Sequence, residues 1–182
     1  MTKLLQKKYF YSLLFFVVLL AIRLCFFQIY IISGNSMFPT IKNGDILFVS
    51  RIFFPIKLPF IKETVQIGKP NLQKNEILVF ENNKNEILVK RLQGTPFDFY
   101  IFDNDKFLVS PDEIPSPKNS KEEKNWKGSI DGNLEFLPIF EKGRIPEGYY
   151  LLLGDNRDYS TDSRSFGLVP FSYLRGKVLW IF

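Results

Sequence analysis

Ser36 and Lys90 are the two residues whose types and surroundings could carry out chemistry in this chain of 182 residues. The sequence contains no histidine, which excludes Ser-His-Asp and Cys-His mechanisms and most zinc sites. Ser36 lies in the stretch SGNSMFPT, which lacks the last glycine of the lipase-type G-x-S-x-G motif, and no serine begins an S-x-x-K motif. A serine nucleophile would therefore need a lysine from elsewhere in the chain as its base.

Lys90 meets that requirement because it ends the apolar run EILVK. Its stem leaves a predicted strand beside Leu88 and Val89, and burial among apolar groups lowers the pKa of a lysine. On the sequence pattern alone, a lysine that ends a strand more often reaches solvent, and a serine in a turn is more often an ordinary turn residue. Both interpretations stay open at this point.

A third cluster, GDNRDYSTDSRSFG at residues 154–167, follows an apolar strand. It places acidic and basic side chains in alternation around three serines, and its charged members are Asp155, Arg157, Asp158, Asp162 and Arg164. Alternating charges and turn-forming side chains indicate an irregular segment that is stiffened by internal ion pairs and hydrogen bonds. The pattern favours a functional site over a solvated loop.

The elements that position these residues begin with an apolar stretch from residue 9 to residue 32, which is long enough for a membrane-spanning helix of roughly 20 residues. Arg23 opposes that interpretation, but an off-centre arginine can reach the lipid headgroups. A cleaved signal peptide is the alternative, although no small-x-small cleavage pattern precedes Arg23. Lysines at 3, 7 and 8 place residues 1–8 in the cytoplasm and residues 33–182 outside it.

The rest of the chain reads as one domain of short strands. Apolar runs predict strands at 44–49, 76–80, 86–92, 99–102, 106–109, 149–156 and 176–182. Residues 110–132 are rich in Pro, Ser, Lys and Glu and predict an exposed excursion. The net charge of +5 comes from scattered residues, which disfavours a nucleic-acid partner, and Cys25 is the only cysteine, which excludes an internal disulfide.

Taken together, these segments resemble the type I signal peptidases, which are membrane-anchored serine proteases that remove signal peptides from exported proteins. SGNSMFPT is similar to the nucleophile box of the family, and Gly44-Asp45 to its next element. VKRLQGTPFD, from Val89, is similar to the lysine box, and GDNRDYSTDSR to the last and most distinctive box. The order of the boxes and the preceding apolar stretch also agree, so the resemblance covers essentially the whole chain.

The resemblance implies roles for individual residues. Ser36 would be the nucleophile and supply the oxyanion amide, Lys90 the general base, and Ser160 a hydroxyl that orients the lysine amine. Four residues would structure the site: Asp155, Arg157, Asp162 and Arg164. No metal or other cofactor is implied.

The resemblance also implies a fold, partners and a location. We expect a mostly antiparallel β structure with one N-terminal transmembrane helix and a smaller inserted region at about 99–148. Secretory precursors with small residues before the cut and membrane lipid are the expected partners, at the plasma or inner membrane. A narrow substrate pocket is expected beside four residues: Gly34, Met37, Leu88 and Val89.

Three positions depart from the family pattern. Phe97 occupies a position where the family usually has glycine, and Asn75-Glu76 stand where Gly-Asp is common. Gly34 replaces a serine that donates to the oxyanion in one branch of the family, so the backbone amide of Ser36 would carry more of that stabilisation.

The chain has 20 phenylalanines, which is more than one small core needs. A run of apolar residues is equally consistent with core packing and with insertion into the membrane interface: Ile52, Phe53, Phe54, Ile56, Leu58 and Phe60. Two rival functions are a non-catalytic anchored β module that binds exported segments, and a serine-lysine self-cleaving repressor. The repressor would need a DNA-binding head and no membrane anchor, which is the reverse of this sequence.

Overall fold

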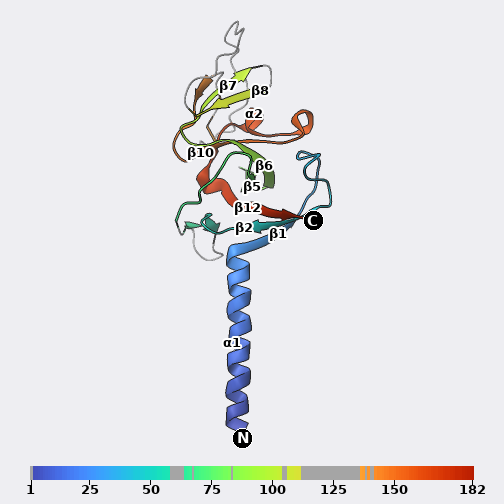
Figure 1. The fold of residues 1–182 in the computed structure, drawn as a ribbon, viewed down its shortest axis with the longest axis vertical. Helices are drawn as coiled ribbons and strands as arrows, with labels where there is room; N and C mark the ends of the chain where they lie inside the picture. Colours follow the sequence, from blue (N-terminus) through green and yellow to red (C-terminus); the bar gives the residue numbers. More distant parts are fainter. Residues whose placement is uncertain are drawn as a thin grey trace.

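A long N-terminal helix leads directly into a β structure. The structure is a computed structural model that describes residues 2–57, 64–66, 68–82, 84–103, 106–111, 136–137, 139 and 142–182. Helix α1, Thr2–Phe26, contains neither proline nor glycine and projects away from the strands, with the N-terminus at its far end (Figure 1). Its apolar side chains between Tyr9 and Leu20 are exposed. Within the described residues, no helix meets the length and hydropathy expected of a membrane span.

The helix ends earlier than the predicted span. Residues Phe27–Ile31 form strand β1, which pairs antiparallel with β2, Ile46–Ser50. Ile32 continues this pairing, because its backbone N–H donates to Asp45 O at 2.9 Å. The prediction that the apolar helix continued to residue 32 was therefore wrong at its C-terminal end. Hydropathy does not separate a helix from the apolar strand that follows it.

The main sheet has seven strands in the order β1-β2-β12-β5-β6-β10-β11. Its further strands are β5, Ile77–Glu81; β6, Ile87–Gly94; β10, Tyr149–Leu153; β11, Val169–Pro170; and β12, Leu174–Ile181. All neighbouring strands are antiparallel, so the predicted antiparallel β class is confirmed. The pairing register shifts once within β10 and twice within β12. Register shifts of this kind mark β-bulges, which bend a strand.

Two smaller sheets flank the main one. Strands β7, Phe99–Asp103; β8, Lys106–Ser110; and β9, Lys142–Arg144 form a sheet in the order β8-β7-β9. This sheet lies inside the predicted inserted region at 99–148, whereas most of the predicted excursion at 110–132 lies outside the described residues. Strands β3, Ile56–Lys57, and β4, Thr64–Val65, form a two-stranded ribbon.

Three apolar clusters fix these sheets. One contains Phe80, Leu92, Leu152 and Leu174, and it also contains Phe54, so this residue is core. The exposed neighbours Ile52 and Phe53 are not core, and Leu58 and Phe60 lie outside the described residues. The second cluster packs Met37 and Ile41 against strands β2, β5 and β6. The third, around Tyr100 and Ile145, joins β7 to β10.

Candidate active site

The turn that carries Ser36 follows strand β1 and is fixed by two buried side chains. Met37 is 3% exposed and Ile41 is fully buried, and both pack against Leu47, Val49 and Val89. The backbone N–H of Ile41 donates to Met37 O at 2.9 Å, which closes the turn. Ser36 itself stays half-buried at the rim of this cluster. The local sequence thus anchors the apolar residues and leaves the serine accessible.

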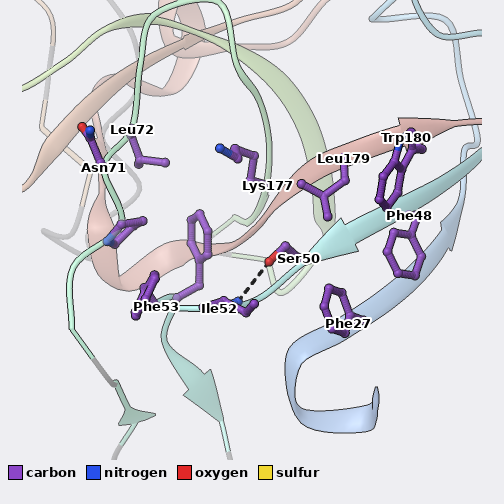
Figure 2. Close-up of a pocket in the computed structure, with 12 residues that line it drawn as sticks. Phe27, Phe48, Ser50, Ile52, Phe53, Asn71, Leu72, Lys177, Leu179 and Trp180 are labelled. Atoms are coloured by element: carbon purple, nitrogen blue, oxygen red, sulfur yellow. Dashed lines mark hydrogen bonds between the residues drawn. The ribbon is translucent and has the colours of Figure 1, made fainter. Parts of the chain in front are cut away.

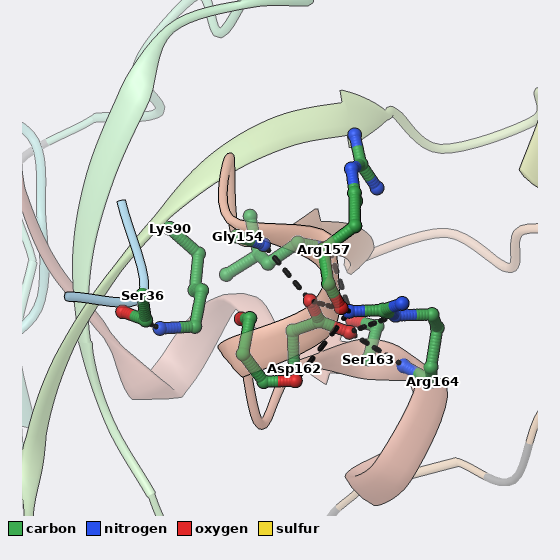
Figure 3. A network of polar contacts seen from close by, with 9 residues as sticks. Ser36, Lys90, Gly154, Arg157, Asp162, Ser163 and Arg164 are labelled. Atoms are coloured by element: carbon green, nitrogen blue, oxygen red, sulfur yellow. Dashed lines mark hydrogen bonds and ion pairs between the residues drawn. The ribbon is translucent and has the colours of Figure 1, made fainter. Parts of the chain in front are cut away.

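Lys90 reaches Ser36 from the middle of strand β6, 54 residues further along the chain. The Nζ of Lys90 lies 2.7 Å from Ser36 Oγ and donates a second hydrogen bond to Val89 O at 3.1 Å (Figure 3). Lys90 is 2% exposed. The alternative interpretation, in which the Lys90 side chain reaches solvent, is therefore wrong. The two residues of the predicted dyad lie in contact.

Burial lowers the pKa of Lys90 from its ordinary value of 10.5 to about 8, although the Asp162 and Asp155 carboxylates act in the opposite direction. Removal of the amine from water disfavours its charged form more than these carboxylates favour it. A substantial fraction of the Lys90 amine is therefore neutral at mildly alkaline pH, which a proton acceptor requires.

Asp162 is the buried centre of the loop that follows β10. Its carboxylate accepts hydrogen bonds from the backbone N–H of Gly154 at 2.9 Å and from Arg164 Nε at 2.9 Å (Figure 3). It also caps the short helix α2, Ser163–Phe166, by accepting from the Arg164 N–H. Burial alone raises the pKa of Asp162, but the hydrogen bonds from Arg164 and Gly154 outweigh it and hold that pKa below its ordinary value.

Asp155 joins three segments of the chain. Arg91, the residue after Lys90, donates to both Asp155 oxygens, at 2.8 and 2.6 Å, and Thr40 Oγ1 donates to the same carboxylate at 2.6 Å. Burial raises the pKa of Asp155, but Arg91 and Thr40 lower it below its ordinary value. The arrangement connects the Ser36 turn, the Lys90 strand and the loop after β10. Sequence reasoning missed Arg91 and Thr40. The only signal for them was their position, Thr40 at the end of SGNSMFPT and Arg91 within VKRLQGTPFD.

Asn156 is a further residue that sequence reasoning missed. Its backbone N–H donates to Ser36 O at 3.0 Å and its side-chain Nδ2 donates to Asn35 O at 3.0 Å. Gly154 lies beside the same carbonyl, since a Cβ built on it would be 2.6 Å from Ser36 O and would also collide with the Ser160 side chain. The loop after β10 therefore packs directly against the segment that carries Ser36.

Ser160 and Arg157 differ from their expected roles in detail. Ser160 Oγ is buried and has no hydrogen-bond partner in the described part of the chain, although it lies near enough to Asp162 to help lower the pKa of that carboxyl. Within the described residues, no hydrogen bond joins Ser160 Oγ to the Lys90 amine, which was its expected partner. Arg157 offers its carbonyl to Arg164 Nη2 at 2.5 Å, while its own exposed side chain points away from Asp162 (Figure 3).

The expected pocket residues separate into two groups. Met37 and Val89 share one apolar cluster, whereas Leu88 packs against the other cluster with Phe80. Successive residues of a strand face opposite sides, so Leu88 and Val89 do not line one pocket together. Gly34 has a φ of 108°, is exposed, and donates its N–H to Asn43 Oδ1 at 3.1 Å.

The departures from the family pattern are accommodated in the backbone. Phe97 and Asn75 adopt φ values of 74° and 73°, the left-handed region in which glycine is the usual residue. Arg144 stacks its guanidinium 5.2 Å from the Phe97 ring and donates to Phe97 O at 3.0 Å. The turn at residues 95–98 therefore forms with phenylalanine at position 97. Its buried Asp98 accepts a hydrogen bond from the Thr95 N–H at 2.7 Å.

Comparisons with known proteins identify the family of this chain. The family described as "Signal peptidase, peptidase S26" matches residues 6–182. A signal peptidase I from Bacillus caldolyticus is 33% identical over 162 residues, which cover 88% of this chain and 82% of that protein. A signal peptidase IB from Staphylococcus aureus is 35% identical over 158 residues, which cover 84% of this chain and 76% of that protein.

A crystal structure of a signal peptidase I from Enterococcus faecalis V583 is also similar. It is 32% identical, with a TM-score of 0.40, over 63% of this chain and all of that one. The full-length match to the family and the curated relatives carry the assignment. The chain therefore belongs to the signal peptidase family, peptidase S26, and is a serine peptidase.

Proposed function

We propose that this protein cleaves the signal peptides of exported proteins with a Ser36-Lys90 dyad. The observation that carries the proposal is the 2.7 Å contact between Ser36 Oγ and the Nζ of a buried lysine whose pKa is about 8. Membership of the family supports the substrate class. Secretory precursors are the proposed partners.

In the proposed reaction, the neutral Lys90 amine takes the proton of the Ser36 hydroxyl as Oγ attacks the carbonyl carbon of the scissile peptide. The resulting lysinium gives that proton to the nitrogen of the departing chain, and an acyl-enzyme remains on Ser36. Lys90, again neutral, then takes a proton from water, whose oxygen attacks the ester and releases the cleaved signal peptide. As the ester bond breaks, the lysinium returns this proton to Ser36 Oγ, which regenerates both the serine hydroxyl and the neutral amine.

The oxyanion is proposed to bind the backbone N–H of Ser36. No hydrogen bond occupies this N–H within the described residues, whereas the Gly34 N–H is used by Asn43. A preorganised backbone donor is effective because it does not reorient during the reaction. Ser160 is proposed to orient the Lys90 amine with its unpaired hydroxyl, and Met37 and Val89 to restrict the pocket to small side chains.

We also propose that helix α1 anchors the protein in the plasma or inner membrane, with the N-terminus in the cytoplasm. The exposed apolar side chains between Tyr9 and Leu20 and the early lysines support this orientation. A signal peptide presents its cleavage site near the membrane surface. A serine that follows the anchor closely along the chain is placed to meet that site.

The test is Ser36→Ala in purified full-length protein, incubated in detergent with a secretory precursor. We expect an unchanged melting temperature and no cleavage, whereas the wild type should yield one new N-terminus that follows a small residue. Cleavage that persists in the variant, free of contaminating peptidase, would reject the dyad. A wild type that cleaves no precursor under conditions in which a known signal peptidase does would reject the function.

A further inference from the structure

An apolar groove of about 680 Å³ lies where helix α1 meets the sheet, apart from the dyad. We define the groove by six of its lining residues: Phe27, Phe48, Phe53, Leu72, Leu179 and Trp180. Figure 2 shows Phe48 on β2 beside Leu179 and Trp180 on β12, Phe27 on β1, and Phe53 and Leu72 on loops that complete the groove. The volume lies in the range of about 300–1,000 Å³ that is typical of ligand sites. Neither Ser36 nor Lys90 lines it.

Aromatic rings form one end of the groove. The rings of Phe27 and Phe48 stack with their centroids 5.3 Å apart, and Trp180 lies 5.4 Å from Phe48. Trp180 is nevertheless 59% exposed, so much of this apolar surface has no protein cover. Large aromatic side chains that are packed on one side and open on the other are typical of surfaces that meet an apolar partner.

Phe53 forms the opposite wall at a conformational cost. Its φ of 68° is unfavourable for a bulky side chain, and its ring lies against Gly68, where an added Cβ would approach Cδ1 to 3.1 Å. The ring is also 46% exposed. An unfavourable backbone angle that presents an apolar ring to an open groove is more readily explained by a ligand than by core packing.

Among the described residues that line the groove, none offers an unpaired charge to a ligand. Lys177, which also lines the groove, is paired with Glu76 at 2.9 Å, and the Ser50 hydroxyl accepts from the Ile52 N–H at 3.3 Å. A ligand would therefore be selected for its apolar chain and not for an ionic head group.

An extended peptide fits this groove poorly. Strands β2 and β12 lie inside the sheet order and are paired on each side, so along them the groove presents side chains and no free strand edge. Of the lining residues that the structure describes, only Phe27 comes from an edge strand, β1. A peptide lying there would bury backbone N–H and C=O groups without partners. A hydrocarbon chain carries no such groups.

The groove also adjoins the proposed membrane anchor. Phe27 follows the last residue of α1, and the Arg51 N–H donates to Phe26 O at 2.7 Å, which ties the helix end to the strand that lines the groove. Figure 1 shows α1 joining the β structure at β1 and β2. We propose that the groove holds one acyl chain of a membrane phospholipid. This inference rests on the proposed anchoring by α1 and not on the proposed peptidase chemistry.

The experiment uses the full-length protein in phosphatidylcholine nanodiscs that contain a lipid with a photoactivatable diazirine in one acyl chain. After irradiation, the labelled residues are mapped by mass spectrometry. We expect adducts on groove residues such as Leu72 and Leu179 in addition to α1. Adducts confined to α1 and to exposed residues outside the groove would overturn the proposal.

Two variants test the groove itself. Phe53→Gly removes one wall and relieves the unfavourable φ, so groove adducts should fall several-fold without a lower melting temperature. Leu179→Glu places a charge in the groove and should have the same effect on labelling. Ile31→Ala is the matched control, because Ile31 is exposed on neighbouring β1 but does not line the groove. Undiminished labelling in both groove variants would reject the site.

Two further measurements separate this proposal from its alternatives. Ser36→Ala should label like the wild type, so a chain that labels in the groove but cleaves no precursor would reject only the peptidase function. Precursor added before irradiation should leave groove adducts unchanged. Their loss would show that the apolar part of a signal peptide occupies the groove and would overturn the lipid proposal.

Discussion

At the scale of single residues, the neutral form of the Lys90 amine controls the proposed reaction. We expect kcat/KM for precursor cleavage to rise with pH and to level off above a midpoint near 8, the pKa that burial gives Lys90. An exposed lysine would give a midpoint near 10.4. The measurement is a pH profile of kcat/KM at constant ionic strength, in a range in which the melting temperature is constant.

Lys90→Arg provides the control for that profile. Its guanidinium keeps the positive charge and much of the stem but does not deprotonate in this range, so cleavage should be lost. Substantial cleavage by the purified variant, with Ser36 still required, would show that another group is the base.

Gly154 is predicted to tolerate no side chain. A Cβ at this position would lie 2.6 Å from Ser36 O and would collide with the Ser160 side chain, so Gly154→Ala should displace the segment that carries the proposed nucleophile, Ser36. Overpacking of this kind costs about 1–3 kcal/mol of stability, and we expect a fall in kcat of about 100-fold or more, because small misplacements of reacting groups are costly.

A matched control for this substitution is Gly176→Ala. Gly176 lies on β12, outside the dyad, and is also crowded, with Val49 Cγ1 at 2.5 Å and Ser50 O at 2.7 Å from the built Cβ. It should lower the melting temperature with a much smaller loss of kcat. Equal losses of kcat in the two variants would show that Gly154 acts only through stability.

At the scale of elements, the loop after β10 depends on the buried ion pair of Asp162 and Arg164. The side chain of Asp162 is fully buried and that of Arg164 is 13% exposed. Arg164→Ala would leave a buried carboxylate without its cation, which typically costs about 3–5 kcal/mol. Urea unfolding at neutral pH should show this loss. Lys69→Ala, which breaks an exposed pair with Glu147, should change stability little.

The cost of Arg164→Ala should depend on pH. The pKa of Asp162 is lower in the folded protein than in the unfolded chain, so the stabilisation is complete above the unfolded value of about 3.9 and is lost as pH falls through the folded pKa. The difference in unfolding free energy between wild type and Arg164→Ala should therefore shrink in acid. A difference that stays constant below pH 4 would exclude the ion pair as its source.

Among the elements, strands were predicted well where their apolar runs are bounded by polar turns. The runs at 76–80 and 86–92 correspond closely to β5 and β6. The run at 149–156 was predicted too long, because residues 154–156 leave the strand to contact the Ser36 turn. Strand β1 was missed since its apolar residues continue the composition of the helix before it. Each error occurs where tertiary contacts decide the boundary.

At the scale of the whole molecule, the proposed topology places the two ends of α1 on different sides of a membrane. Protease added outside intact spheroplasts should therefore digest residues after Ile32 and spare an N-terminal epitope tag. Permeabilised spheroplasts, in which the tag is also digested, supply the control. Digestion of the tag from outside, or protection of the β structure, would contradict the orientation.

The sequence by itself determined the chemistry that was available. Without histidine a serine peptidase must use another base, and the spacing of Ser36, Lys90 and the 154–167 loop along the chain matched one family. It also determined the main strands and the N-terminal helix, because hydrophobic periodicity and turn residues are local properties. The position of Ser36 soon after the apolar helix is likewise visible in the sequence.

Only the tertiary structure decided which of these residues meet. The Ser36–Lys90 contact joins residues 54 positions apart, and Asp155 binds Arg91 and Thr40 from 64 and 115 positions away. Such contacts depend on strand register and sheet order, which arise from pairing between distant segments. Burial, and with it the lowered pKa of Lys90, exists only once those segments have packed, because local sequence does not specify the surroundings of a side chain.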